Sequence, residues 1–388
     1  MLAVVKILYH HRVASKDGQH VHIQEIIKSL QKQGHELILV APRAGENQAF
    51  GGDGGVISTL KKVTPKFIYE ILEFGYAFIA AAKLLWAVRQ HSPDFIYERF
   101  NLFTPAGIWV KKIAGVPLVL EVNAPLYEER NEHDGLGLKR LAKWTQAYTW
   151  RQADVVLPVT RVLAQQIIAY GVTPSKVHVV HNGINAEEFM GDRPSLKPPI
   201  DISNRTVIGF VGFCRKWHGL DKILELLLQP GNEHLFFLLV GDGPAVPALR
   251  EYGVENGLSD RIHITGVVQR KDMPMWLRPI DIALQPAVVG YASPLKLLEY
   301  MATGKAIVAP DQPNIRELLQ HEHSALLFQP DNQDDFIRAC NRLASDRALR
   351  ERLAENARHA IVERRLFWDD NAAKIVTLAE TFITHQRA

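Results

Sequence analysis

Short apolar runs alternate with helical patterns along almost the whole chain, and this alternation restricts the possible folds more than any other feature. In the first half the expected strands are Val4–Tyr9, Leu37–Val40, Asp94–Tyr97, Leu118–Val122, Val155–Val159 and Val177–Val180. In the second half they are Val207–Val211, Leu235–Val240, Ile262–Ile264, Ile282–Leu284, Ala306–Ala309 and Ala325–Phe328. Strands that alternate with helices pair in parallel and are covered by helices on both faces. The sequence therefore predicts an α/β protein with two doubly wound parallel sheets.

The alternation is interrupted near the middle of the chain. Pro194, Pro198 and Pro199 fall there, and a proline cluster favours a loop over regular structure. A length of 388 residues also exceeds one ordinary core and fits two domains. We therefore expect an N-terminal domain over residues 1–190, a linker over 191–204, a C-terminal domain over 205–365 and a final helix over 366–388.

The composition excludes several classes of protein. The 45 Lys and Arg residues against 42 Asp and Glu leave a net charge of +3, which is not the basic surplus of a nucleic-acid-binding protein. Only Cys214 and Cys340 occur, which excludes a disulfide framework and is typical of a reducing cytoplasm. The apolar run Met1–Tyr9 contains Lys6, and we interpret it as a first strand rather than an export signal.

The segment Phe67–Val88 is the most hydrophobic long stretch and permits two interpretations. It contains Glu70, Glu73 and Lys83, which argue against a transmembrane helix. Its large apolar residues form the buried face of a long helix, the interpretation that we favour, and they are Phe67, Ile68, Ile71, Phe74, Phe78 and Leu84. Alternatively, part of that face rests on a membrane surface, where anionic lipid would meet Lys61, Lys62 and Lys66.

A helix that begins near Ser293 is predicted to bind an anion. Ser293 suits the N-cap, and Pro294 suits the first helical position, where its missing N–H group costs nothing. The free N–H groups from Leu295 onward favour a phosphate, and Lys296 adds a positive charge. Glu299 follows at about 7.5 Å along the axis, a distance that suits a ribose attached to a bound diphosphate. The alternative is that Glu299 and Lys296 are ordinary solvated helix residues.

Three loops after expected strands carry further candidates, because ligands of doubly wound folds bind at the carboxyl ends of the strands. Small residues there let the backbone approach a ligand closely, and cations there can meet a phosphate. The candidates are Gly212, Arg215, Lys216 and His218 in the first loop, Gly241 and Gly243 in the second, and Gly266 and Val267 in the third. His10 and His11 are adjacent in a strand and point to opposite faces, so we expect no metal site.

The motifs VGFCRKWHG, VGDGP, TGVV, SPLKLLEYMATGKAIVAP and NIREL occur in this order, and the set resembles the donor-binding domain of retaining GT-B glycosyltransferases of family 4. In the first half the loop Lys16–His22, the strand GHELILVAP and the segment HNGINAEEF resemble the N-terminal domain of that family. The resemblance implies two Rossmann-like domains facing across a cleft, the C-terminal one binding a nucleotide sugar. It also implies that the final helix packs back on the N-terminal domain.

The resemblance also assigns roles to residues of the C-terminal half. Glu299 matches the second Glu of the family's Glu-x7-Glu motif, which implies contact with the ribose. Tyr291 stands where the motif has its first Glu, so the donor sugar is expected to meet a phenol there. Phe213 and His218 stand where the family usually has Arg and Lys, which leaves the charge near the diphosphate to Arg215 and Lys216.

For the N-terminal half the resemblance implies an acceptor side. Asn123 falls near the position where the family often has a His, and it can form hydrogen bonds but cannot transfer a proton. The expected acceptor-side residues are Gly18, His22, Glu121 and Asn123. The expected catalytic residues are Glu299, Tyr291, Arg215, Lys216 and Asn123.

The implied function is retaining sugar transfer from a nucleotide-diphosphate sugar to a glycan or polyprenyl-linked acceptor. LEVNAPLYEER and the SPLK form resemble a bacterial branch associated with exopolysaccharide and lipopolysaccharide assembly, which implies a cytoplasmic protein, either free or peripheral at the inner face of the membrane. No metal or other cofactor is expected. Two alternatives stay open, a GT-B nucleotide-sugar epimerase and a non-catalytic nucleotide-sugar-binding paralogue. A NAD-dependent dehydrogenase is disfavoured, because neither half has a Gly-x-Gly-x-x-Gly pattern after its first strand.

Overall fold

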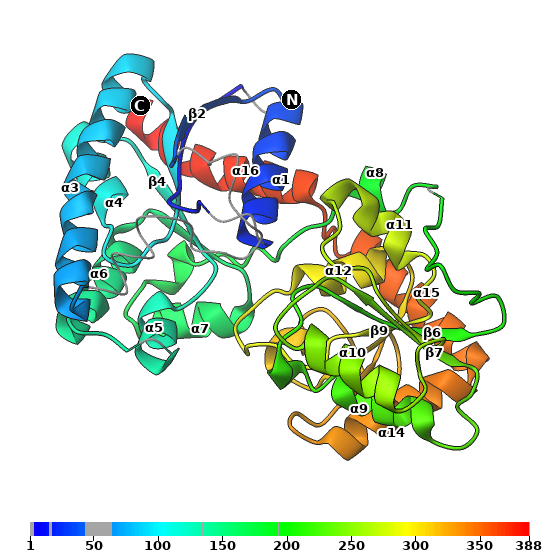
Figure 1. Cartoon of the computed structure of the whole chain (residues 1–388). Helices are drawn as coiled ribbons and strands as arrows, with labels where there is room; N and C mark the ends of the chain where they lie inside the picture. Colours follow the sequence, from blue (N-terminus) through cyan, green and yellow to red (C-terminus); the bar gives the residue numbers. More distant parts are fainter. Residues whose placement is uncertain (1–3, 15–17, 43–63, 134, 193, 388) are drawn as a thin grey trace. The chain divides into compact units, whose positions relative to one another are not determined.

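The computed structural model describes residues 4–14, 18–42, 64–133, 135–192 and 194–387 (Figure 1). It divides the chain into two compact units. The first comprises Met1–Asn182 and Trp368–Ala388, and the second comprises Gly183–Phe367.

The described part of the first unit contains a five-stranded parallel sheet. Its strand order is β2-β1-β3-β4-β5. The strands are β1 (Lys6–His10), β2 (Glu36–Val40), β3 (Phe95–Arg99), β4 (Leu118–Val122) and β5 (Val155–Pro158). The strand expected at Val177–Val180 is wrong, because only Val177 forms a bridge there, to Val156 at the edge of the sheet.

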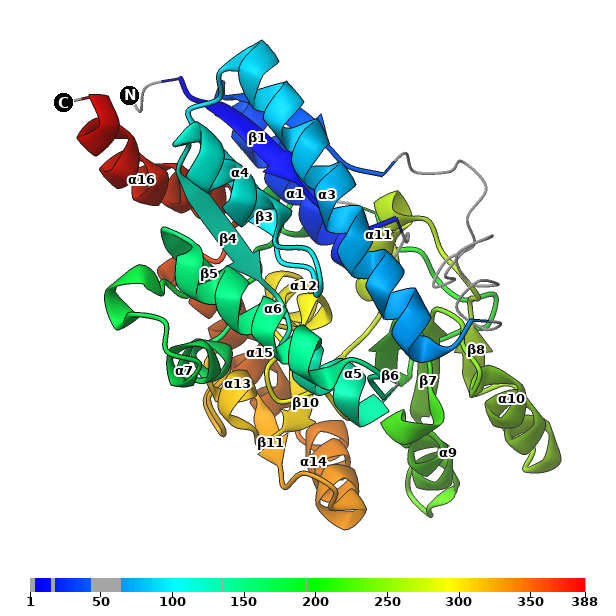
Figure 2. The same cartoon turned by 90° about the vertical axis from the view of Figure 1, so that its left-hand side faces the viewer.

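Helices cover both faces of this sheet. They are α1 (Gly18–Lys32), α3 (Lys66–His91), α4 (Ala106–Ala114), α5 (Leu126–His133), α6 (Lys139–Gln152), α7 (Arg161–Ala169) and α16 (Trp368–Arg387). The helices α1 and α16 pack on each other on one face, and α3 and α4 pack on each other on the other face (Figures 1 and 2). The final helix thus completes the layer of the first unit that α1 begins.

The second unit contains a six-stranded parallel sheet of order β11-β10-β9-β6-β7-β8. The strands are β6 (Thr206–Val211), β7 (Leu235–Val240), β8 (Ile262–Ile264), β9 (Ile282–Leu284), β10 (Ala306–Pro310) and β11 (Leu326–Phe328). After β8 the chain crosses to the other side of β6, so the strand order reverses between β6 and β9. Such a reversal leaves a crevice at the carboxyl ends of the two strands, where doubly wound folds bind ligands.

The two faces of the second sheet carry separate hydrophobic clusters. Successive residues of β6 point to opposite faces of the sheet. Ile208 and Phe210 therefore lie in one cluster, and Val207 and Val211 lie in the other. The helices on the first face are α9 (Asp221–Leu228), α10 (Val246–Glu255) and α14 (Gln333–Ser345). Those on the second are α8 (Ala186–Phe189), α11 (Met273–Leu277), α12 (Leu295–Ala302) and α15 (Arg347–Glu363), and a further short helix is α13 (Pro313–Arg316). The predicted fold class, two doubly wound parallel sheets, is confirmed.

The predicted domain boundaries differ from the observed ones. The first boundary lies between Asn182 and Gly183 rather than after residue 190, and the second lies between Phe367 and Trp368. Ile184 forms a bridge with Phe367, and the buried Phe189 of α8 lies in the core of the second unit. The proline-rich segment therefore does not separate the units, because the residues before it are already packed into the second one.

The predicted buried face of α3 is also wrong. Of the residues expected to be buried, Leu84 is inside, whereas Phe67, Ile68, Ile71 and Phe78 are exposed. Alanines pack α3 on the unit instead, because their small side chains let two helices approach closely; they are Ala77, Ala80, Ala81 and Ala87. The outer side of the helix is consequently apolar. Within the described residues α3 is also the one helix that is long and apolar enough to cross a membrane, by length and composition alone.

The hydroxyl group of Tyr300 joins α12 to the two strands where their order reverses. It accepts a hydrogen bond from the N–H group of Val211 at 3.0 Å and lies 3.3 Å from the carbonyl oxygen of Leu284, to which it donates. Val211 ends β6 and Leu284 ends β9, and Tyr300 is completely buried. The phenol therefore satisfies backbone groups of both strands at the point where they diverge.

We expect Tyr300→Phe to lower the free energy of unfolding by about 1–3 kcal/mol, because the buried N–H group of Val211 loses its acceptor. A urea titration followed by circular dichroism measures the change. Tyr252→Phe, which alters a partly buried tyrosine of α10, is the matched control. An unchanged midpoint for Tyr300→Phe would contradict this role of the hydroxyl.

Candidate functional site

The loops after β6 and β7 of the second unit interlock through their backbones. The N–H group of Cys214 donates to the carbonyl oxygen of Asp242 at 2.7 Å, and the carbonyl oxygen of Cys214 accepts from Ala245 at 3.2 Å. The residues of the first loop also form a short 3₁₀ helix, Lys216–His218. These hydrogen bonds hold two of the three candidate loops together at the carboxyl edge of the sheet.

Gly241 and Gly243 are required by this interlocking. Both have positive φ angles, 144° and 149°. A Cβ atom on Gly241 would lie 2.1 Å from the carbonyl oxygen of Gly212, and one on Gly243 would lie 2.2 Å from that of Cys214. Their N–H groups are occupied by Thr265 Oγ1 and Asp242 Oδ1. The sequence predicts that these glycines let the backbone approach a ligand closely. In the structure they let the backbones of two neighbouring loops approach each other.

His218 is buried against Phe210 and Trp217, with ring centroids 4.8 and 4.0 Å away. Its Nδ1 accepts a hydrogen bond from the N–H group of Arg215 at 3.0 Å, so the ring proton lies on Nε2. Burial, together with the nearby charge of Lys296, lowers the pKa of His218 to about 3. His218 is accordingly a neutral side chain that shapes the loop.

Arg215 and Lys216 are exposed at the start of the same turn. The guanidinium group of Arg215 lies 5.2 Å from the centroid of the Phe213 ring. Phe213 itself is partly exposed. The two cations therefore lie beside the loop, where they remain accessible to a ligand.

The start of α12 differs by one position from the prediction. Pro294 is the N-cap, with extended backbone angles, and Leu295 is the first helical residue. Ser293 is buried one position earlier. The side chain of Asn314 fixes the preceding loop by donating to the carbonyl oxygens of Val289 and Ala292. The first-turn N–H groups, those of Leu295 and Lys296, have no acceptor within the helix.

Lys296 points from the first turn of α12 toward the loop after β6. Its ammonium group lies 4.2 Å from the centroid of the Phe210 ring, and a Cβ atom placed on Gly212 would lie 3.3 Å from Nζ. Gly212 has a φ of 122°, which favours glycine at that point. Burial lowers the pKa of Lys296 to about 8, although the carboxylate of Glu299 opposes the shift. The structure therefore brings Lys296 and Gly212 together.

Glu299 is buried one turn further along α12 and forms an ion pair with Arg270. Arg270 belongs to the short 3₁₀ helix Arg270–Asp272, which follows the loop of Gly266 and Val267. Its guanidinium group also lies 4.9 Å from the centroid of the Phe189 ring. Glu299 is thus a buried, paired carboxylate, and the alternative of an ordinary solvated helix residue is wrong.

The remaining donor-side candidates lie in the loops after β8 and β9. Gly266 has a φ of 73° and forms a bridge with Gly241, which ties the third loop to the second. The side chain of Val267 is exposed. Tyr291 is half-buried in the loop that leads to α12. The four loops thus meet around the point where the strand order reverses.

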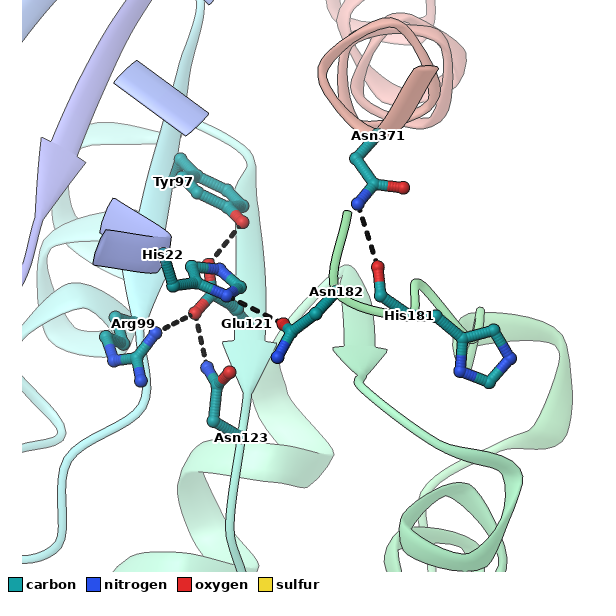
Figure 3. Close-up of polar contacts among 8 residues, drawn as sticks. All are labelled: His22, Tyr97, Arg99, Glu121, Asn123, His181, Asn182 and Asn371. Atoms are coloured by element: carbon teal, nitrogen blue, oxygen red, sulfur yellow. Dashed lines mark hydrogen bonds and ion pairs between the residues drawn. The ribbon is translucent and has the colours of Figure 1, made fainter. Parts of the chain in front are cut away.

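The first unit contains a second candidate set, centred on the buried carboxylate of Glu121 at the end of β4 (Figure 3). Tyr97 donates to its Oε2 at 2.6 Å, and Arg99 and Asn123 both donate to its Oε1. The Nε2 atom of His22 lies 3.0 Å from Oε2. Although burial opposes ionisation, the charges of His22 and Arg99 hold the pKa of Glu121 well below its usual range. Glu121 is therefore ionised near neutral pH and orients its four neighbours.

His22 links this carboxylate to the end of the first unit. Its Nδ1 lies 2.8 Å from Oδ1 of Asn182, and its ring packs edge-on against Trp368 of α16. Asn371 of α16 donates to the carbonyl oxygen of His181, the residue before Asn182 (Figure 3). Of the predicted acceptor-side residues, His22, Glu121 and Asn123 lie together, while Gly18 is exposed at the start of α1.

Several contacting residues were missed by sequence reasoning. Arg99 could have been found, because it ends a buried strand at the edge where ligands bind. The pairing of Arg270 with Glu299 had no such signal, since Arg270 lies in a polar stretch that reads as an ordinary surface turn. Among the described residues, no group of three or more His, Cys, Asp or Glu side chains could hold a metal ion.

Two family models match the chain, the first mainly within the first unit and the second within the second unit. The model described as Glycosyltransferase Family 4 matches residues 16–188, and that described as Glycosyl transferases group 1 matches residues 205–346.

Individual relatives agree with the family models. An alpha-D-kanosaminyltransferase of Streptomyces kanamyceticus is 25% identical over 64% of this chain and 66% of its own length. An Escherichia coli UDP-Gal:alpha-D-GlcNAc-diphosphoundecaprenol alpha-1,3-galactosyltransferase is 25% identical over 73% of this chain and 74% of its own. The matches span 55% to 66% of the length of the first three curated relatives. These transferase names do not favour an epimerase.

Among solved structures, Anabaena Alr3699/HepE in complex with UDP has a similar fold. The TM-score is 0.70 at 19% identity, and the similarity covers 97% of this chain and 100% of the other.

The environment of Glu121 makes a testable prediction about stability. We expect Glu121→Gln to lower the free energy of unfolding near neutral pH by about 3–5 kcal/mol, because Arg99 would be left as a buried, unpaired charge. The folded-state pKa lies below the ordinary value of 4.5, so ionised Glu121 contributes stability above that pH and loses it as the pH falls further. The difference in the free energy of unfolding between Glu121→Gln and the unaltered protein should therefore become smaller as the pH falls below 4.5.

Melting temperatures measured from pH 7 down to about pH 2.5 check this expectation, because the loss of stability begins only below the ordinary pKa of 4.5. Glu132→Gln, which alters an exposed carboxylate of α5 in the same unit, is the control. A pH-independent difference for Glu121→Gln would contradict an ionic role for the carboxylate.

Proposed function

Because the chain belongs to the glycosyltransferases of family 4 and group 1 and has their GT-B fold, we propose that it transfers a sugar from a nucleotide-diphosphate sugar to a glycan or lipid-linked acceptor. We propose that the transfer retains the anomeric configuration and serves the synthesis of a cell-surface polysaccharide in the cytoplasm. One observation carries the proposal: α12 presents Lys296 beside Gly212 and, one turn later, a buried Glu299 where the strand order reverses.

The donor nucleotide is assigned to this part of the second unit. The N–H groups of Leu295 and Lys296, with the Lys296 ammonium group, are suited to the diphosphate. The carboxylate of Glu299 is suited to the ribose hydroxyls, and Arg270 holds it in place. The loop of Gly266 and Val267 is exposed at the position proposed for the base. The UDP complex of the structurally similar Anabaena protein supports a uridine nucleotide as the first donor to test.

The chemical step that we propose depends on stabilising the leaving group. A hydroxyl oxygen of the acceptor would attack the anomeric carbon from the face on which the diphosphate departs, without an enzymic nucleophile, and its proton would pass to the departing β-phosphate oxygen. Charge would develop on a β-phosphate oxygen, where preorganised N–H groups, Lys296, Arg215 and Lys216 can stabilise it. Loss of one such donor typically costs about 3 kcal/mol of transition-state stabilisation. Tyr291 is assigned to a hydroxyl group of the donor sugar, and the proposal includes no metal ion or cofactor.

The first unit is assigned to the acceptor. Glu121 is committed to four neighbours and stays ionised, so it is not suited to donate a proton. It instead fixes the side chain of Asn123 through the amide nitrogen, which leaves the amide oxygen of Asn123 to accept a hydrogen bond from a sugar hydroxyl. His22 is held in the same network and is assigned to the acceptor as well.

A lipid-linked acceptor requires contact with a membrane, and we propose that the outer face of α3, α4 and α6 makes it. The helix α3 exposes Phe78, Ile79 and Trp86, with exposed fractions of 60%, 54% and 66%. All three helices lie on the same side of the first unit (Figures 1 and 2). The exposed charged residues of these helices are basic, and they are Lys66, Lys83, Arg89, Lys112, Lys139, Arg140, Lys143 and Arg151.

The acidic residues of these helices do not offset that charge. Glu70 is buried, where it accepts hydrogen bonds from the N–H groups of Gly137 and Leu138, and Glu73 is paired with Arg130. An apolar stripe surrounded by cations is the pattern that binds anionic lipid. Lys61 and Lys62, which the sequence analysis also expects to meet anionic lipid, lie outside the described residues.

A thermal-shift screen of UDP-, GDP- and ADP-sugars tests the donor site, because a ligand that binds only the folded state raises its melting temperature. We expect one nucleotide class to do so. Glu299→Gln should weaken binding at least about tenfold, because a charged hydrogen-bond partner is lost. Lys296→Met should weaken it less, and Glu251→Gln on α10 is the control. If no nucleotide sugar binds, or Glu299→Gln equals the control, the donor assignment is wrong.

Sedimentation with phospholipid vesicles tests the membrane assignment. We expect the protein to bind vesicles containing phosphatidylglycerol and to bind neutral phosphatidylcholine vesicles several-fold more weakly. The double variant Phe78→Ser, Trp86→Ser should lose most of the binding, whereas Val254→Ser, at an exposed site of the second unit, should keep it. Equal binding by both variants would contradict the proposed surface.

A further inference from the structure

A polar cavity of about 330 Å³ lies in the second unit, at the opposite end of the sheet from the donor loops. Lys305, which lines it, directly precedes β10, and Arg278 comes shortly before β9. The cavity therefore opens at the amino ends of these strands. Its other lining residues are Phe189, Met190, Gly191, Asp192, Ala302, Thr303 and Arg358.

Three cations from separate elements converge on this cavity. Arg278 follows α11, Lys305 follows α12, and Arg358 belongs to α15. Among the lining residues Asp192 is the one carboxylate, and it lies 3.8 Å from Arg278 with a fully exposed side chain. Asp281 also acts on Lys305 but does not line the cavity. The cavity thus has an excess of positive charge.

Two of these cations are held by backbone carbonyl groups. Arg278 Nη2 donates to the carbonyl oxygen of Gly191 at 2.6 Å, and Lys305 Nζ donates to that of Arg278 at 2.8 Å. Burial lowers the pKa of Lys305 to about 8, because the attraction of Asp281 does not fully offset the loss of hydration. Carbonyl groups position the cations without neutralising them, so their charge remains available to an anion.

We propose that this cavity is a binding site for a small phosphorylated anion, such as a diphosphate or a sugar phosphate, separate from the donor site. Its volume is at the lower end of the range for small-molecule sites, which suits a ligand of this size. Arginine and lysine side chains from three directions match the several oxygen atoms of a phosphate group.

The cavity is connected to Glu299 by two routes, one through Arg270 and one directly to the backbone of Glu299. The ring of Phe189 lines the cavity and also packs against the guanidinium group of Arg270, which pairs with Glu299. The hydroxyl group of Thr303, another lining residue, donates to the carbonyl oxygen of Glu299 at 2.7 Å. An anion in the cavity therefore contacts residues that touch Arg270, the partner of the Glu299 carboxylate, and the backbone of Glu299 itself.

Isothermal titration of the nucleotide-free protein with inorganic pyrophosphate tests the proposal. Binding should weaken at least about tenfold in Arg358→Gln, which removes an exposed cation and leaves the backbone contacts of Arg278 and Lys305 intact. Lys305→Met is a second variant with the same expectation. Arg347→Gln, at the other end of α15, is the matched control and should bind as the unaltered protein does.

Lys296→Met distinguishes the cavity from the donor site. Pyrophosphate binding that survives Lys296→Met and is lost in Arg358→Gln supports the proposal. No detectable binding, equal binding by Arg358→Gln and Arg347→Gln, or loss in Lys296→Met alone would overturn it. Because no nucleotide sugar is present, failure of the donor assignment would not affect this result.

Amide hydrogen exchange with and without pyrophosphate tests the connection. Saturating pyrophosphate should slow exchange in α12 and in the segment that contains Arg270, because a ligand that binds the folded state lowers the population of locally open states. Phe189→Leu should remove the effect on the Arg270 segment. Unchanged exchange in both segments would overturn the connection between the cavity and Glu299.

Discussion

The hydroxyl group of Tyr300 forms hydrogen bonds with backbone groups that the topology of the second sheet leaves without a neighbouring strand. Where the strand order reverses, β6 and β9 part, and backbone groups at their ends lose the neighbours that a continuous sheet would give them. The phenol of α12 pairs with both strands from within the core. The same helix carries Lys296 and Glu299, so the contact that closes the sheet also sets the position of both side chains relative to the loops.

Much of the fold could be predicted because it depends on periodicity. Apolar runs such as Leu118–Val122 and Leu235–Val240 are observed strands with the predicted bounds, since a strand covered on both faces needs apolar residues throughout. The candidate loops could be located in the same way, because they directly follow the predicted strands. Periodicity did not show which side of α3 is buried, because alanine and large apolar residues both read as apolar while only the alanines pack closely.

The candidate site could be predicted only in part. Lys296 and Glu299 were found from their spacing on one helix, which is local information. The partner of Glu299 could not be found, because Arg270 reaches it through the packing of a separate 3₁₀ helix. The glycines were found, but for a different reason: Gly241 and Gly243 admit the carbonyl groups of the neighbouring loop. Distances within an element are encoded locally, whereas contacts between elements depend on the whole core.

The return of the chain in α16 has a consequence for the order of folding. The first unit contains Trp368 and the buried face of α16, so its hydrophobic core is incomplete until α16 has been made. The second unit is continuous in sequence and lies wholly before that helix. On the ribosome, therefore, the unit encoded second can finish first, and the unit encoded first must wait with an uncovered surface until α16 has been made. A chain interrupted anywhere before α16 would expose the surface around His22.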